Sequence, residues 1–193
     1  MKESDIKIKP SAHARIKAKC EEIGFTMPSD LFVGSLLKTL VASKPCGNFL
    51  ELGTGIGLSL SWMADGMDDC GSIISIDNDP KLTAIVSQFF KLDSRVNILC
   101  QDGSEWINNY TGEKFDLIFA DAWPGKYSEL DKVLALLKVG GIYVIDDMNP
   151  QPNWPDGHAE KAQNLIRTLE AKKDFNMTKM NWSTGIILMS KMK

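Results

Sequence analysis

Several features that would place this chain in another class of protein are missing from its 193 residues. The four cysteines form no C-x-x-C pair, no apolar run is long enough to span a membrane, and there is no repeat or low-complexity segment. The amino terminus is charged and lacks the apolar stretch of a signal peptide. Neither sign of charge dominates, because 22 basic residues against 25 acidic ones give a net charge of −3. We therefore expect a cytoplasmic protein whose partners are small molecules, with no nucleic acid and no membrane among them.

The cysteines are few and scattered, at Cys20, Cys46, Cys70 and Cys100. Their neighbours are residues typical of a protein core. The sequence therefore predicts reduced, buried thiols, which is the usual state of cysteine in the cytoplasm.

Apolar periodicity predicts alternating strands and helices along the chain. Strands are expected at 49–52, 72–77, 96–100, 115–120 and 142–145, with an antiparallel pair at 174–182 and 185–190. Helices are expected at 11–23, 31–41, 58–67, 81–92, 104–109, 128–137 and 159–172. Gly140 and Gly141 are expected to end the helix at 128–137. Together these elements predict an α/β fold with a doubly wound, seven-stranded, mostly parallel sheet and a C-terminal antiparallel hairpin.

Three alternate glycines, Gly53, Gly55 and Gly57, lie between the first predicted strand and the helix at 58–67. Glycine permits positive φ and lets a ligand approach the backbone, and the start of the helix offers unpaired N–H groups to a polar ligand. A dinucleotide site needs a small residue at the sixth position of its fingerprint, where this chain has Leu58, which disfavours a nicotinamide-dependent oxidoreductase. Glu51 would repel a pyrophosphate but would hold a cation. This combination points to S-adenosylmethionine, and the alternative is a tight connection that binds nothing.

Polar residues that suit a nucleoside follow the predicted strands at the edge where open α/β sheets bind ligands. Asp77 is placed to accept hydrogen bonds from ribose hydroxyls, whereas Asp102 could accept the adenine amine or could cap the next helix. The expected cofactor-binding set is Glu51, Gly53, Thr54, Gly55, Gly57, Ser59, Asp77, Asn78, Asp102, Gly103, Ser104 and Asp121.

From about Met27 to its end the chain resembles the class I S-adenosylmethionine-dependent methyltransferases, and within them the O-methyltransferases of the catechol and caffeoyl-CoA type. FLELGTGIGLSLS is similar to the first motif of that family, IISIDNDP to its ribose motif, and DAWPGKY to the later D-x-W-x-x-[RK]-Y motif. The resemblance implies a Rossmann-like fold and O-methylation of a small hydroxylated acceptor, which could be aromatic. We expect one methyltransferase domain over 1–193, with helices in 1–45 covering the site and a cofactor-binding core at 46–193.

The resemblance also implies a divalent metal held by Asp121, Asp146 and Asp147. Three carboxylates suit Mg²⁺, Mn²⁺ or Ca²⁺. The chain departs from the family pattern at two positions: Pro124 replaces the catalytic lysine, which leaves Lys126 as a displaced substitute, and Asp147 replaces an asparagine. The alternative is that Asp146 and Asp147 only end a strand and contact the cofactor.

The acceptor side of the site is less defined. Without a metal, His158 or Lys126 is the candidate catalytic base, although a lone histidine in a Pro/Gly-rich loop such as 148–158 is more often just solvated. Trp123 and Trp154 are candidates to line the site of an aromatic acceptor, or are ordinary packing residues. A non-catalytic module that binds S-adenosylmethionine is a second interpretation of the whole chain, and a homodimer is one assembly that the sequence leaves open.

Overall fold

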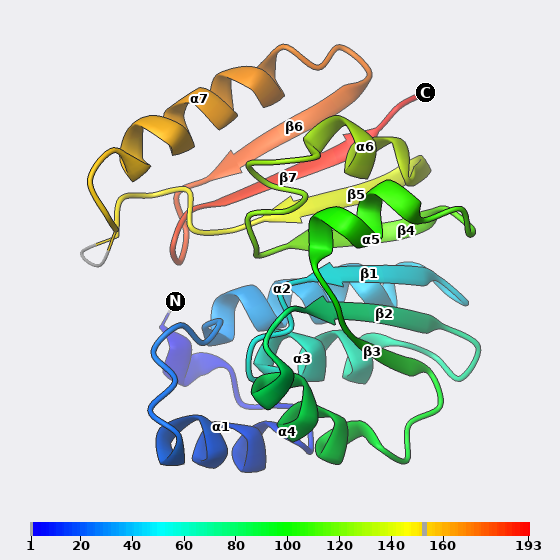
Figure 1. Ribbon diagram of the computed structural model, residues 1–193, viewed down its shortest axis with the longest axis vertical. Coiled ribbons are helices and arrows are strands. Elements are labelled where there is room, and N and C mark those ends of the chain that lie inside the picture. Colours follow the sequence, from blue (N-terminus) through cyan, green and yellow to red (C-terminus); the bar gives the residue numbers. More distant parts are fainter. Residues whose placement is uncertain (1, 152–153) are drawn as a thin grey trace.

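The computed structural model describes residues 2–151 and 154–193, and a single seven-stranded sheet runs through this part of the chain (Figure 1). The strands are β1 (Asn48–Leu52), β2 (Ser72–Asp77), β3 (Val96–Cys100), β4 (Phe115–Ala120), β5 (Leu137–Ile145), β6 (Phe175–Met180) and β7 (Ile186–Lys191). They lie in the order β3-β2-β1-β4-β5-β7-β6, with β1 to β5 parallel and β7 antiparallel to both of its neighbours. The predicted fold class is therefore confirmed.

Helices connect the strands and cover both faces of the sheet. They are η1 (Glu3–Asp5), α1 (His13–Glu22), α2 (Leu31–Ala42), α3 (Leu58–Gly66), α4 (Pro80–Phe90), α5 (Gly103–Asn109), α6 (Leu130–Ala135) and α7 (His158–Glu170). Local signals set several of their starts: the Asp30 carboxylate accepts a hydrogen bond from the Val33 N–H at 2.8 Å, and Asp79 caps α4 just before Pro80. None of the helices in the described ranges combines the length and the apolar content needed to cross a bilayer.

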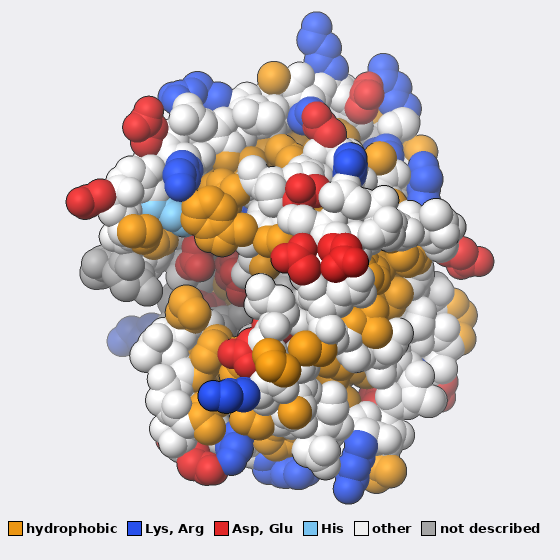
Figure 2. All heavy atoms as spheres, viewed as in Figure 1, with side chains coloured by type: hydrophobic (Ala, Val, Ile, Leu, Met, Phe, Trp, Pro, Cys, Tyr) orange, Lys and Arg blue, Asp and Glu red, His pale blue; other side chains and the backbone are white. Residues whose placement is uncertain are grey.

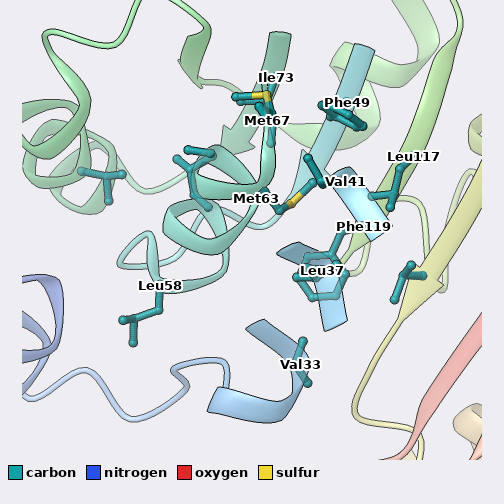
Figure 3. Close-up of a cluster of buried hydrophobic side chains, with 14 of the residues drawn as sticks. Val33, Leu37, Val41, Phe49, Leu58, Met63, Met67, Ile73, Leu117 and Phe119 are labelled. Atoms are coloured by element: carbon teal, nitrogen blue, oxygen red, sulfur yellow. The ribbon is translucent and has the colours of Figure 1, made fainter. Parts of the chain in front are cut away.

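Successive residues of each central strand point to opposite faces and so build two hydrophobic clusters. Phe49 of β1 belongs to the cluster under α1 to α4, whereas the next residue, Leu50, belongs to the cluster under α5 to α7. Figure 3 shows Leu37 and Val41 of α2 beside Phe49 and Phe119 in the first cluster. Burying one such side chain stabilises the fold by about 1.5–3 kcal/mol relative to its exposure. The sheet is therefore held between two helical layers, and its edges remain free to carry polar residues.

The segment around Gly140 and Gly141 differs from the prediction. Helix α6 ends at Ala135, and the two glycines lie inside β5 rather than at the end of a helix. Phe115 pairs with Leu137 but Leu117 pairs with Ile142, so β5 contains extra residues at this point. Gly140 has a φ of +77°, which this irregularity requires and which glycine adopts without strain. Pairing with β4, a long-range interaction, has overridden the local helix-ending signal.

The prediction of four buried, reduced thiols is also wrong. Cys46 and Cys70 form a disulfide bond and are exposed, Cys100 is an exposed free thiol, and only Cys20 is buried among the described residues. The sheet explains the pairing, because the register joins Asn48 of β1 to Ser72 of β2. Cys46 and Cys70 each lie two residues before these positions, so they are brought together as well. This proximity depends on strand register and leaves no local pattern in the sequence.

The turn between β1 and α3 is packed too closely for any side chain larger than hydrogen at two positions. Gly53 has a φ of +100°, and a Cβ atom there would lie 2.7 Å from the Asp121 carbonyl oxygen. Gly57 has a φ of +87°, and a Cβ there would lie 2.8 Å from Val86 Cγ1. Both conformation and contact therefore demand glycine, and the end of β1 is held directly against the end of β4.

Replacement of Gly53 should show this contact in the free energy of unfolding. Gly53→Ala should lower it by about 2–5 kcal/mol, because left-handed strain adds to the clash with a backbone oxygen. Gly140→Ala is a matched control, since Gly140 also has positive φ but a Cβ there would meet nothing within 4 Å; its cost should be about 1–2 kcal/mol. Equal losses in urea denaturation would contradict the proposed contact.

Removal of the disulfide should destabilise the folded protein. The bond spans a sequence separation of 24 that includes β1, the glycine turn and α3, and closing a loop of this size restricts the unfolded chain by about 3 kcal/mol. The double variant Cys46→Ser/Cys70→Ser should therefore melt at a lower temperature in calorimetry, whereas Cys100→Ser should not. A melting temperature unaffected by the double substitution would contradict a stabilising disulfide.

Candidate functional site

The sequence-predicted polar residues gather at the edge formed by the carboxyl ends of β1, β2, β4 and β5, toward the left of Figure 1. Figure 2 shows acidic side chains set back in a hollow of this face, with hydrophobic side chains beside them. Two parts of the site can be distinguished. One is the glycine turn after β1, and the other is a group of three aspartates after β4 and β5.

Asp77, the last residue of β2, holds the glycine turn in place. Its carboxylate accepts the Gly55 N–H at 2.8 Å through Oδ2 and the Asp79 N–H at 2.9 Å through Oδ1. The Gly53 N–H also donates to the backbone of β2, to the Ile76 carbonyl at 2.8 Å. Each carboxylate oxygen can accept a further bond, so the half-buried Asp77 remains able to accept hydroxyl donors.

Glu51 lies fully buried beneath the same turn. Its Oε2 accepts a hydrogen bond from the Ser75 hydroxyl at 2.5 Å, and Ser75 in turn contacts the Thr54 hydroxyl at 2.6 Å. Oε1 has no hydrogen-bond partner in the described part of the chain. Burial raises the pKa of Glu51 to about 7, against the opposing effect of the nearby Ser59 and Ser75 hydroxyls.

The segment between α1 and α2 covers the glycine turn. Phe25, Met27, Pro28 and Ser29 line a cavity together with the turn, and the Phe25 ring would lie 3.3 Å from a Cβ at Gly55. The remaining lining residues are Gly53, Thr54, Gly55, Ile56, Leu58, Ser59 and Asp121. The cavity measures about 20 Å³, room for about one water molecule. A ligand as large as a nucleoside therefore cannot be contained in this cavity as it stands.

Asp102, the predicted adenine contact, and other members of the expected cofactor-binding set have structural roles or positions of their own. Asp102 caps α5 by accepting the Glu105 N–H at 2.9 Å, and the Ser104 hydroxyl donates to Glu129 at 2.6 Å. A Cβ at Gly103 would lie 2.9 Å from the Pro124 ring, and Asn78 is exposed beside Asp77. The capping alternative for Asp102 is thus observed, and an additional contact to adenine stays a prediction.

Asp121, Asp146 and Asp147 come together as expected, with one carboxylate oxygen from each within 4.8 Å of the others. Asp146 is buried, and its Oδ1 lacks a partner among the residues described. Burial and the neighbouring carboxylate raise the pKa of Asp121, and burial likewise raises the pKa of Asp146. Asp147 has a φ of +51°, and its N–H is held by the Thr184 hydroxyl at 3.2 Å. Three acidic groups are therefore kept close together against their mutual repulsion.

Lys126 is buried behind this triad of aspartates. Its ammonium donates a hydrogen bond to the Asp146 carbonyl oxygen at 2.7 Å, and its charge opposes the rise in the pKa of Asp121. Gly125, with a φ of +84°, turns the chain so that this lysine points inward, and the Tyr143 hydroxyl fixes that turn by donating to the Gly125 carbonyl at 2.6 Å. The geometry therefore suits a counter-charge for the triad.

His158 is the first residue of α7, so its predicted place in the loop is wrong, whereas its side chain stays partly exposed to solvent. It is half-buried in an aromatic cluster: its Nε2 lies 3.2 Å from the Tyr127 hydroxyl, and its ring centroid lies 4.5 Å from that of Trp154 and 6.0 Å from that of Trp123. Burial, followed by Lys126 and Lys161, lowers the pKa of His158, which favours the neutral imidazole. The predicted loop at 148–157 includes residues 152 and 153, which lie outside the described residues.

The sequence-based reasoning gave no role to three residues that shape the site. Ser75 lies in the middle of β2, opposite Glu51 in the strand register, and only that register identifies it. Phe25 covers the turn from outside the core motifs. Tyr127 could have been found, since it ends the DAWPGKY motif and faces His158 in the structure.

Comparisons with known proteins agree with this geometry. A putatively assigned caffeoyl-CoA O-methyltransferase of Arabidopsis thaliana is 32% identical over 120 residues, which cover 59% of this chain and 52% of that protein. The chain thus matches about half the length of such curated relatives.

Solved structures share the fold. The O-methyltransferase TomG of Streptomyces achromogenes, in complex with SAM, superposes with a TM-score of 0.84 at 19% identity, covering 98% of this chain and 93% of that one. The O-methyltransferase of Bacillus cereus, in complex with SAH, superposes with a TM-score of 0.81 at 22% identity, covering 97% and 94%. The O-methyltransferase family model matches residues 14–192. Because that match spans nearly the whole sequence, the chain belongs to the O-methyltransferase family.

Proposed function

We propose that the protein transfers a methyl group from S-adenosylmethionine to a hydroxyl of a small acceptor. An aromatic compound would fit the acceptor site. The observation that carries this proposal is the position of Asp121, which lines the cavity at the glycine turn and is also one of the three clustered aspartates. The place for a donor and the place for an acceptor oxygen are therefore adjacent. Methyl transfer is an in-line displacement, for which such adjacency is the main requirement.

On the cofactor side, Asp77 would accept the ribose hydroxyls, and the glycine turn with Ser59 and Glu51 would hold the methionine part. The start of α3 has no side-chain cap, which leaves its N–H groups available to the carboxylate of the methionine. The cofactors named with the two solved relatives, SAM and SAH, support this assignment. The other residues proposed for the cofactor are Gly53, Thr54, Gly55, Gly57, Asn78, Asp102, Gly103, Ser104 and Asp121.

On the acceptor side, Asp121, Asp146 and Asp147 fit a divalent cation such as Mg²⁺, Mn²⁺ or Ca²⁺. The fit rests on their proximity and on the buried, unpartnered Oδ1 of Asp146, since oxygen donors of this kind suit hard cations. A metal bound there would lower the pKa of an acceptor hydroxyl and orient it. Lys126 would hold Asp146 in position through its backbone carbonyl.

The aromatic cluster would form the wall of the acceptor site. Trp123 is 51% exposed, with the Lys161 ammonium 4.5 Å from the centre of its ring, whereas Trp154 packs against His158. An exposed indole face offers stacking to a flat acceptor. The segment that covers the glycine turn would exclude water from the reacting atoms.

A metal-independent reaction is the second candidate. It would use His158 as the base, because the lowered pKa of this residue keeps the imidazole neutral and the Tyr127 hydroxyl orients its ring. Lys126 is a weaker candidate base, since its ammonium is already bonded to a carbonyl. A non-catalytic module that only binds the cofactor would show no turnover with any acceptor.

We also propose one domain over 1–193, with helices in 1–45 covering the site and the cofactor-binding core at 46–193. The shared hydrophobic cluster of α1, α2 and the sheet supports this division of roles within one unit. A cytoplasmic location stays a prediction, and the Cys46–Cys70 disulfide weighs against it, because disulfides persist mainly in oxidising compartments. A homodimer and the absence of nucleic-acid and membrane partners also stay predictions.

Substitution of Asp77 tests the cofactor site. Asp77→Ala should weaken S-adenosylmethionine binding by about 1.5–3 kcal/mol, the scale of hydrogen bonds to a charged acceptor. Asp79→Ala is a matched control, because it removes the cap of α4 next to the same turn but no ribose contact. Isothermal calorimetry that gave equal affinity for wild type and Asp77→Ala would remove the ribose assignment.

Chelation tests the acceptor site. If the three aspartates hold a metal that orients the acceptor, exhaustive chelation should abolish methyl transfer to a trial catechol and leave cofactor binding largely intact. Asp147→Asn should retain activity because an amide oxygen still coordinates, whereas Asp146→Ala should lose it because an anionic ligand is removed. Full activity after chelation, together with a collapse of the rate in His158→Ala, would instead establish the metal-independent reaction.

A further inference from the structure

Glu51 is a fully buried acid to which the fold itself supplies no cation. It forms no ion pair within the described ranges, and its Oε1 accepts no hydrogen bond there. Its Oε2 accepts a hydrogen bond from the neutral Ser75 hydroxyl, and the other side chain that stabilises its anion, Ser59, is also a neutral hydroxyl. A buried carboxylate without a counter-charge is costly as an anion.

The elements packed around Glu51 add no positive charge. Neighbouring β2 contributes Ser75 and the acidic Asp77, whose charge also raises the pKa of Glu51. On the other side β4 pairs Phe119 with Glu51 and leads into another acid, Asp121. Helix α3 contributes the Ser59 hydroxyl, and the covering segment at 25–29 brings the hydroxyls of Thr26 and Ser29 and otherwise apolar side chains. Every one of these neighbours is neutral or acidic, so Glu51 is best accommodated as the neutral acid while the site holds no ligand.

We propose that binding of the amino-acid end of S-adenosylmethionine displaces a proton from Glu51 to the solvent, so that the cofactor binds more weakly as the medium becomes acidic. This inference rests on the proposed function of the glycine turn. The O–H bond of the Glu51 carboxyl breaks, the proton passes to water or buffer, and the resulting carboxylate pairs with the ammonium of the ligand.

The arrangement suits a zwitterion. The uncapped start of α3 favours the ligand's carboxylate, and two acids lie near its ammonium: Asp121 lines the cavity, whereas Glu51 is buried beneath the same turn with an unpartnered Oε1 among the described residues. The Thr54–Ser75–Glu51 chain of hydroxyls would orient the carboxylate, since Ser75 can donate to Oε2 in either protonation state. The ammonium would supply the partner that Oε1 lacks.

The expected linkage is large enough to measure. Given a pKa of about 7 for Glu51 in the free protein, the dissociation constant should fall roughly 20-fold between pH 5.5 and pH 7.5. The sign follows because a proton must leave before the ion pair forms, so affinity is lost below the pKa of the free protein. The α-amino group of the ligand titrates near 8 and is about a quarter deprotonated at pH 7.5, which lowers the expected change from about 25-fold to about 20-fold.

Calorimetry in two buffers of different ionisation enthalpy measures the released proton directly. At pH 6.5, binding of S-adenosylmethionine should release roughly three quarters of a proton in the wild-type protein. S-adenosylhomocysteine, which keeps the ammonium, should behave alike, and 5′-methylthioadenosine, which lacks the amino-acid end, should bind without release. Glu51→Gln should remove the release that comes from Glu51 and the corresponding pH dependence, leaving only what the nearby Asp121, whose pKa burial also raises, contributes.

A second variant keeps the test independent of how Glu51→Gln folds. Ser75→Ala removes the hydrogen bond to Oε2 and should move the midpoint of the affinity profile to higher pH. Tight binding of S-adenosylmethionine with no released proton and no pH dependence would overturn the proton linkage alone. Failure of the wild-type protein to bind it at any pH would overturn the proposed function as well.

Discussion

The contact between the glycine turn and the end of β4 is the constraint on which the rest of the site depends. The Asp121 N–H donates to the Leu52 carbonyl at 2.8 Å, and the Asp121 carbonyl lies so close to Gly53 that no Cβ fits between them. Because the two strands are parallel neighbours, their carboxyl ends finish at the same edge. One short contact thus joins the proposed cofactor turn to the first residue of the aspartate triad.

A buried acid without a cationic partner is common to both halves of the site. Glu51 lies beneath the turn, and Asp146 lies in the triad, each fully or nearly fully buried with an oxygen that has no partner within the residues described. Such groups destabilise a fold unless something pairs with them, so the two hydrophobic layers must outweigh their cost. Lys126 offsets part of the charge in the triad, whereas no comparable cation acts on the pKa of Glu51. A cationic cofactor and a divalent metal are the two ligands that would complete this electrostatic pattern.

The opposite edge of the sheet, where β1 and β2 begin, has a structural role. There the disulfide joins the segments that lead into β1 and β2, so the strand that carries the glycine turn is fastened at its amino end while its carboxyl end opens into the site. The segment at 25–29 covers the turn at the opposite end of the same strand, where the Phe25 ring lies close to Gly55. A strand fastened at one end and covered by a separate segment at the other is compatible with repeated binding and release.

Local sequence determined the elements and the edge at which the chemistry gathers. Alternating apolar runs and helix caps such as Asp30 and Asp79 act over a few residues, and the order of strands and helices then places the acidic residues at one side of the sheet. For the same reason the glycine turn and Asp77 could be placed from the sequence, since both lie directly at the ends of their strands.

Tertiary structure alone decided the features that depend on register and packing. The Cys46–Cys70 bond, the pairing of Ser75 with Glu51, and the glycines within β5 all follow from which residues of distant segments lie opposite one another. The burial of Lys126 against the Asp146 carbonyl and the contact of Tyr127 with His158 likewise bring together residues at least 20 positions apart. No local pattern records such contacts, because their free energy arises from long-range pairing and burial and outweighs the propensities of the residues themselves.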